Sequence, residues 1–190
     1  MSVIGRLRDA ARRRFRTGHG SDDSETPAGL AMAQYRAGVA SYQARRFRKA
    51  VRELSLAIAL APGHAGMYQH RAAALAELGR LAHAIHDYDR AVHLNPGFSD
   101  TYLDRGNAYH ALGDRERAIR DYEEAIRLRP AFAEAYANRA AVLLEMGRTD
   151  AAESDATRAR ELEIDPAALD ALLRAARAAQ SRKGRRPRPG

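Results

Sequence analysis

The stretch HAIHDYDRAVHLNP at residues 83–96 decides the fold, because it returns 34 residues later as RAIRDYEEAIRLRP at 117–130. Related segments stand one period before and one period after these two, as KAVRELSLAIALAP at 49–62 and AAESDATRARELEI at 151–164. All four keep Ala at the second and ninth positions, and the first three end in Pro. A fixed period of this length indicates an array of repeated structural units.

A second segment precedes each copy at the same period and completes the unit. It occurs as YQHRAAALAELGR (68–80), YLDRGNAYHALGD (102–114) and YANRAAVLLEMGR (136–148). Apolar residues spaced by 3, 4 and 7 are typical of a helix. The Gly near the end of each segment suits the left-handed conformation that stops a helix, and Pro marks the exit from the following helix. The pattern therefore predicts two antiparallel helices per unit.

These units resemble the tetratricopeptide repeat, whose period and pattern of small and bulky residues they share. The resemblance implies an all-α fold, a TPR-type α-solenoid of four helix-turn-helix repeats with a C-terminal capping helix. The repeats span residues 30–166, with boundaries at 31–64, 65–98, 99–132 and 133–166. The first repeat departs from the pattern at Gln34, Ser41 and Arg45. Arg45 replaces the Gly at a cost on the order of 1 kcal/mol, which predicts a looser first repeat.

The flanking segments differ from the repeats in composition. Residues 1–16 predict a basic amphipathic helix, and the Gly-, Ser- and Asp-rich residues 17–29 predict a flexible linker. Residues 167–181 carry an apolar stripe and predict the capping helix that covers the exposed end of the stack. Residues 182–190 combine like charges with Pro, which predicts a disordered basic tail.

Composition excludes several classes of protein. The 190 residues contain no Cys, so disulfides and thiolate chemistry are excluded, and no apolar run is long enough to span a membrane. We expect a cytoplasmic protein. Arg supplies 30 of the 32 basic residues, a usage typical of bacteria with GC-rich genomes. The net charge of +8 is concentrated in the two arms: six Arg and one Asp in residues 1–20 give +5, and five basic residues in 181–190 give +5.

The sequence predicts no catalytic activity, no metal and no cofactor. It lacks a phosphate-binding Gly-rich loop, an HExxH motif and a Ser/His/Asp arrangement. His83 and His86 share a helix at a spacing that could bind a metal, and His93 follows. The equivalent positions in neighbouring repeats are basic residues, so exposed histidines are the favoured interpretation.

The resemblance to tetratricopeptide repeats implies a concave groove that takes an extended peptide or a partner helix. The expected contact residues are Tyr35, Arg36, Tyr42, His70, Asp100, Asp104, Asn107, Glu134 and Asn138. Some members of the family clamp the C-terminal carboxylate of chaperones with two Asn and several basic residues. Asn107 and Asn138 match the Asn positions, but Leu103 stands where a Lys is required. We therefore do not expect a chaperone-tail clamp.

The third and fourth repeats carry several carboxylates on the expected groove. Asp100, Asp104 and Glu134 favour a partner segment with basic residues, through complementary charge. The alternative is that these carboxylates form ion pairs with neighbours such as Arg105 and Arg139 and recognise nothing.

The basic arms allow contact with an anionic membrane surface, with nucleic-acid phosphate, or with a partner groove. The candidate residues for polyanion or membrane contact are Arg6, Arg12, Arg13, Arg14, Arg16, Arg185 and Arg186. An arm of one molecule could also enter the acidic groove of another, which would give a homo-oligomer, or fold back onto its own groove. A tail without aromatic residues can contact nucleic acid only weakly and without sequence specificity.

Two functional hypotheses follow. The first is a bacterial-type adaptor or scaffold that binds a protein segment in its concave groove. The second is a tethering protein whose arms hold it to membrane or nucleic acid while the repeats present a partner. Analogy at the level of the fold supports binding and does not name the partner.

Overall fold

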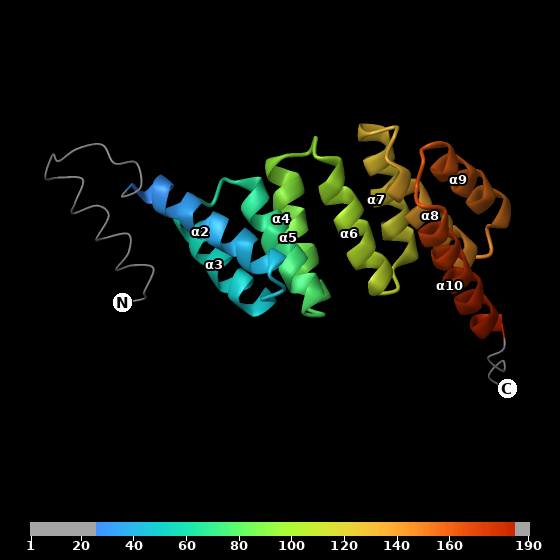
Figure 1. Cartoon of the computed structure of the whole chain (residues 1–190), viewed down its shortest axis with the longest axis horizontal. Helices are drawn as coiled ribbons and strands as arrows, with labels where there is room; N and C mark the ends of the chain where they lie inside the picture. The colour runs from blue at the N-terminus through green and yellow to red at the C-terminus, as the bar shows by residue number, and fades with distance from the viewer. Residues whose placement is uncertain (1–25, 185–190) are drawn as a thin grey trace, which may run out of the picture. The chain divides into compact units, whose positions relative to one another are not determined.

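The computed structural model describes residues 26–184, and over this range every regular element is an α-helix (Figure 1). The chain divides into two compact units, Met1–Pro96 and Gly97–Gly190. The first unit contains α2 (Pro27–Gln43), α3 (Phe47–Leu60), α4 (Ala65–Glu77) and α5 (Leu81–Leu94). The second contains α6 (Ser99–Ala111), α7 (Arg115–Leu128), α8 (Ala133–Glu145), α9 (Thr149–Glu161) and α10 (Pro166–Gly184). The helices pair as α2–α3, α4–α5, α6–α7 and α8–α9, one pair per repeat.

The first helix begins earlier than the sequence pattern indicates. α2 starts at Pro27, inside the range 17–29 that we expected to be a linker. The side chain of Thr26 accepts a hydrogen bond from the backbone N–H of Gly29 at 2.9 Å, and Pro27 supplies a backbone already set for the first helical position. These two residues are a helix start that the Gly- and Ser-rich composition concealed.

The turn inside each repeat ends the first helix in the same way. Gly79, Gly113 and Gly147 have φ between 71° and 85°, the left-handed region that favours glycine. In each turn the next backbone N–H reaches back to a carbonyl of the last helical turn, as Asp114 does to Tyr109 at 2.9 Å. Arg45 takes this position in the first repeat with φ of 57°, as the sequence pattern predicts.

Small residues on the first helix of a repeat face bulky residues on the second. A Cβ atom added at Gly106 would lie 2.7 Å from Cε1 of Tyr122, so the close approach of α6 and α7 requires glycine there. Leu54, Tyr88 and Tyr122 fill the equivalent space in the first three repeats and are almost completely buried. The fourth repeat has Ala156 at this position.

A buried ion pair, which was not predicted from the sequence, also recurs in the last three repeats. Each pair joins an Arg of the first helix to an Asp of the second, with both Arg–Asp hydrogen bonds between 2.7 and 2.8 Å. The pairs are Arg71–Asp87, Arg105–Asp121 and Arg139–Asp155. The hydrogen bond to Asp155 raises the pKa of Arg139. Arg105 and Arg139 thus each pair with an acid of the second helix of their own repeat.

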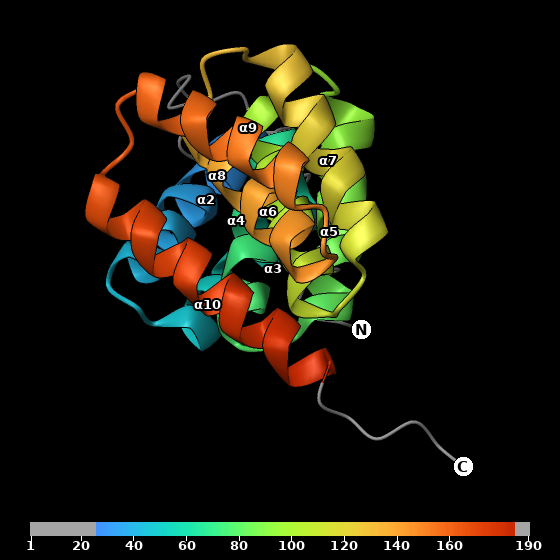
Figure 2. The same ribbon diagram turned by 90° about the vertical axis from the view of Figure 1, so that its right-hand side faces the viewer.

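The last helix packs on the second unit differently from the first helix of a repeat. α4 packs against α3 and α8 against α7, whereas α10 packs chiefly against α8. Leu169, Leu173 and Ala176 are its buried residues. Figure 2 shows α10 (red) set apart from α9 (orange) beyond the short connection that joins them. α10 thus packs mainly on the first helix of the fourth repeat.

Candidate functional site

A hollow of about 700 Å³ opens on the second unit between α6, α8 and α10. Its apolar edges are Leu112, which follows α6, and Leu172 and Ala179 of α10. Leu112 is 51% exposed, an unusual exposure for a leucine, and it stands at the mouth of the hollow. Polar side chains lie between these edges, so the hollow offers both apolar area and hydrogen-bonding groups.

Two hydrogen-bonded asparagines line the hollow. The side-chain oxygen of Asn107 accepts hydrogen bonds from the Tyr122 hydroxyl and from the Asn138 amide, each at 2.9 Å. Burial raises the pKa of Tyr122, so this hydroxyl remains protonated and donates. With its oxygen occupied in this way, Asn107 presents its NH₂ group and Asn138 presents its carbonyl oxygen. One donor and one acceptor side by side match the needs of a peptide backbone.

A triad of His110, Arg115 and Glu145 also lines the hollow. Oε1 of Glu145 lies 3.0 Å from Nε2 of His110, and Oε2 of Glu145 accepts from Nε of Arg115 at 2.8 Å. His110 must carry its proton on Nε2 to make this contact. Glu145 thus serves both partners, and the triad adds little net charge to the hollow.

The predicted groove residues of the second unit separate into two sets. Asn107 and Asn138 line the hollow together. Asp100, Asp104 and Glu134 are not among the lining residues. Asp100 forms an ion pair with Arg129 and Asp104 also has an interaction partner, whereas Glu134 is exposed.

Several lining residues of the hollow were not predicted from the sequence. Leu112 lies in the turn between α6 and α7, and Arg115 is the first residue of α7; we assigned neither to the groove. Leu172 and Ala179 were assigned to the cap, and only the packing of α10 on α8 brings them to the hollow. Leu112, a large apolar residue in a turn, was the one signal of the hollow that the sequence contained.

The first unit brings Tyr35 and His70 together, as a shared groove face would require. Nδ1 of His70 lies 2.8 Å from the carbonyl oxygen of Gly66 and 3.2 Å from the Tyr35 hydroxyl. Since a carbonyl only accepts, Nδ1 carries the proton, which leaves the Tyr35 hydroxyl proton and the His70 Nε2 lone pair to a ligand. Burial raises the pKa of Tyr35. Tyr42 instead packs on Phe47, with ring centroids 5.6 Å apart, and Arg36 is exposed.

The histidines considered as metal ligands are dispersed. His83, His86 and His93 are all exposed on α5. In residues 26–184 no three His, Asp or Glu side chains converge in a way that could hold a metal ion. Nor does any helix in this range have the length and apolar character needed to cross a membrane. The arginines predicted to contact a polyanion or membrane, in 1–16 and at 185–186, lie outside the described residues.

Known proteins share this architecture. A family model described as TPR repeat matches residues 72–113 and 106–147. The crystal structure of MamA superposes with a TM-score of 0.69 at 22% identity, covering 86% of this chain and 95% of that one. The first TPR domain of Spaghetti (RPAP3), bound to the HSP90 peptide SRMEEVD, gives 0.62 at 25% identity, covering 63% and 95%. The Arabidopsis OM64 TPR domain gives 0.60 at 28% identity, covering 61% and 96%.

A search of curated protein sequences found no match. The repeat match and the structural neighbours define the class as an all-α fold of the α-solenoid type. The chain is a tetratricopeptide repeat protein, as its sequence pattern predicts.

Proposed function

We propose that this chain is a non-catalytic protein-interaction scaffold that binds an extended protein segment in the hollow of the second unit. The observation that carries the proposal is the Asn107–Asn138 pair, which offers a donor and an acceptor between two apolar edges. A peptide backbone needs both groups, and Leu112 and Leu172 supply area for one apolar side chain of the segment.

The charged triad influences which kind of protein segment the hollow can bind. Because Glu145 is held by His110 and Arg115, the hollow itself is close to neutral and suits an apolar anchor. A basic residue of the segment, which we expected from the groove carboxylates, would meet Glu134 on the first turn of α8. RPAP3, which is similar over 63% of this chain, is bound to a peptide, and this supports a peptide as the ligand class.

The tethering hypothesis is the second candidate, and the charge of +5 on each arm favours it. The two candidate functions differ in how binding should depend on salt concentration. Attraction of the arms to a polyanion weakens steeply over a few hundred millimolar salt, whereas binding anchored by apolar contacts partly persists.

Selection of a displayed random peptide library on the full-length chain tests the proposal. The selected peptides are titrated against the wild type and against Asn107→Ala/Asn138→Ala. Loss of two backbone hydrogen bonds, each worth about 1 kcal/mol, predicts that affinity falls by a factor of about 10 or more. Asn95→Ala, on the first unit, is the matched control and should leave affinity unchanged. Equal affinity of the double variant and the wild type would contradict the proposal.

A further inference from the structure

A second hollow, of about 290 Å³, lies on the other side of α10, between α8, α9 and α10. Its apolar floor consists of Leu144, Ala152, Ala156 and Leu173. Arg160 of α9 and Arg177 of α10 stand at its edge. It shares no lining residue with the hollow that contains Asn107 and Asn138.

The sequence explains why this space is open. Ala156 occupies the position that Leu54, Tyr88 and Tyr122 fill in the other repeats, so α9 lacks one bulky side chain. α10 packs chiefly on α8, and a hollow lined by residues of α8, α9 and α10 remains between these helices. The volume is at the lower limit for small-molecule sites, which run from about 300 Å³ upward. It therefore suits one large side chain better than a cofactor.

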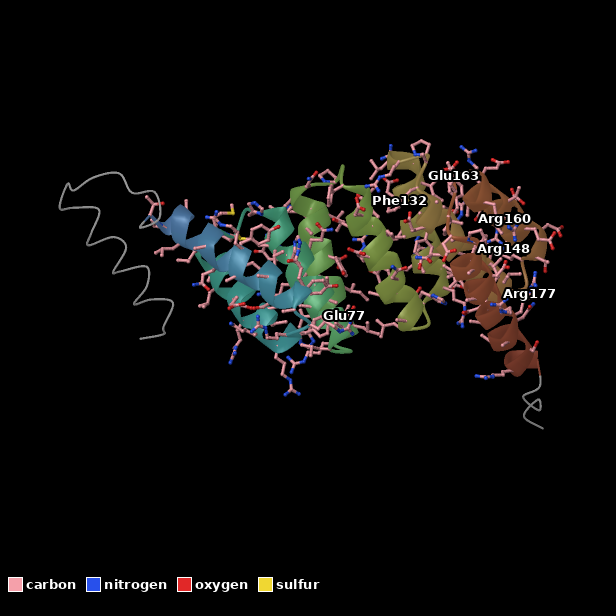
Figure 3. All side chains as sticks on the ribbon, viewed as in Figure 1. Glu77, Phe132, Arg148, Arg160, Glu163 and Arg177 are labelled. Atoms are coloured by element: carbon pink, nitrogen blue, oxygen red, sulfur yellow. The ribbon has the colours of Figure 1, made fainter. Side chains whose placement is uncertain are left out.

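Arg160 and Arg177 are the second observation that points to a ligand, and their positive charge favours a negatively charged one. Both side chains are exposed at the α9–α10 end of the unit, where Figure 3 labels them. Within residues 26–184 neither guanidinium is ion-paired, whereas the neighbouring Arg158 pairs with Glu161 at 2.8 Å. Glu153 is the one acid that lines the hollow in the described part of the chain. Unpaired guanidinium groups beside an apolar surface favour carboxylates, which they bind through two parallel hydrogen bonds.

We propose that this hollow docks an acidic protein segment with one bulky apolar or aromatic side chain between its carboxylates. The bulky side chain occupies the space above Ala156, where the other repeats hold their own Leu or Tyr. The flanking carboxylates pair with Arg160 and Arg177. This site is independent of the proposed function, because the two hollows lie on different sides of α10.

Fluorescence anisotropy with the full-length chain tests the proposal. The probe is a labelled heptapeptide, Gly-Asp-Glu-Tyr-Glu-Asp-Gly, and its partner probe has Ala in place of Tyr. Ala156→Tyr fills the hollow with the residue of the second and third repeats. It is compatible with the fold, since Ala140 and a tyrosine would repeat the Ala72 and Tyr88 combination. Arg160→Glu/Arg177→Glu reverses the charge without changing the floor.

The Tyr probe is expected to bind the wild type at least about tenfold more tightly than the Ala probe, as burial of an aromatic ring requires. Both Ala156→Tyr and the charge reversal should weaken the Tyr probe by a similar factor. The matched control is Arg148→Glu/Arg174→Glu, which makes the same change in net charge at exposed sites outside the lining. The control and the Asn107→Ala/Asn138→Ala variant should retain the affinity.

Three results would overturn the proposal. Equal affinity for the two probes would show that no anchor is bound. Equal loss in both charge-reversal variants would show general attraction of polyanions. No measurable binding of the Tyr probe up to about 1 mM would exclude the site. Loss of the displayed-library peptides in Asn107→Ala/Asn138→Ala, with the Tyr probe unaffected, would support the proposed function separately.

Discussion

The first and third repeats have the same pair of helices but satisfy their polar groups differently. In the third, Arg105 of α6 donates two hydrogen bonds to Asp121 of α7, and Asp121 is only 6% exposed. In the first, the corresponding residues are Ala37 and Glu53. Glu53 accepts a hydrogen bond from Ser41 at 2.6 Å and lies 3.6 Å from Lys49. The difference indicates that apolar packing determines the helix pair, while a carboxylate between the helices must find some local donor.

The largest expected effect comes from breaking the pair in the third repeat. Arg105→Met removes the guanidinium and leaves the Asp121 carboxylate buried without it. We expect the free energy of unfolding to fall by about 3–5 kcal/mol, because removing one member of a buried ion pair is strongly destabilising. Glu53→Gln in the first repeat should cost only about 1 kcal/mol, since Ser41 can still donate. Equilibrium unfolding of the full-length chain in urea measures both.

The control for this comparison is Arg120→Met on the exposed face of α7, which should change stability by less than about 0.5 kcal/mol. Equal losses in Arg105→Met and Glu53→Gln would contradict the interpretation, because they would show that both repeats depend on their polar contacts to the same degree.

The turns allow a further comparison of the first repeat with the later ones, with a smaller expected effect on stability. Arg45 has φ of 57° where later repeats place Gly, a conformation that costs a side chain about 1 kcal/mol. Arg45→Gly should therefore raise the thermal midpoint of unfolding. Greater backbone freedom of Gly in the unfolded chain offsets part of the gain, as does loss of the Arg45 contact with the Phe47 ring, 5.6 Å away. Circular dichroism during heating measures the change.

Two variants serve as controls for the turn. Gly113→Ala places a side chain at φ of 85° and should lower the midpoint. Arg46→Gly, one residue beyond Arg45 and at φ of −90°, should also lower it. A lower midpoint in Arg45→Gly would mean that the arginine makes contacts worth more than the strain.

The periodic features of the fold could be predicted because each depends on one local rule. Gly at 79, 113 and 147 predicts a left-handed helix stop wherever it occurs, and all three have positive φ. In the sequence, the pairing of Arg71 with Asp87 appears only as an Arg that recurs at one position of the repeat and an Asp that recurs at another. Nothing local shows that side chains 16 residues apart meet across the helix pair.

The hollows could not be predicted, since they depend on where α10 packs. The apolar stripe that contains Leu169 and Leu173 predicts a buried helix but not which neighbour covers it. Its contact with α8 brings Leu172 to the hollow that Asn138 lines, and a second hollow remains beside Ala156. Asn107 and Asn138 came from a family resemblance, whereas Arg115 required the structure.

The smallest expected effect concerns how the second helix of each repeat begins. Asp114 precedes α7, whereas Arg46, Arg80 and Arg148 precede α3, α5 and α9 and make no side-chain cap. The Asp114 carboxylate accepts from the backbone N–H of Arg117 at 3.0 Å and from its Nε at 2.6 Å. These hydrogen bonds, the backbone one foremost, lower the pKa of Asp114 below its ordinary value.

A lowered pKa in the folded state fixes the sign of the pH dependence. The carboxylate stabilises the fold above its ordinary pKa, near pH 4, and this contribution is lost as the pH falls through the lower folded-state value. Asp114→Asn keeps a capping oxygen but does not titrate. The thermal midpoint of the wild type should thus exceed that of the variant at pH 7, and the difference should be smaller at pH 3, below the ordinary pKa of an Asp. A difference that is the same at both pH values would show that Asp114 acts through its shape and not through its charge.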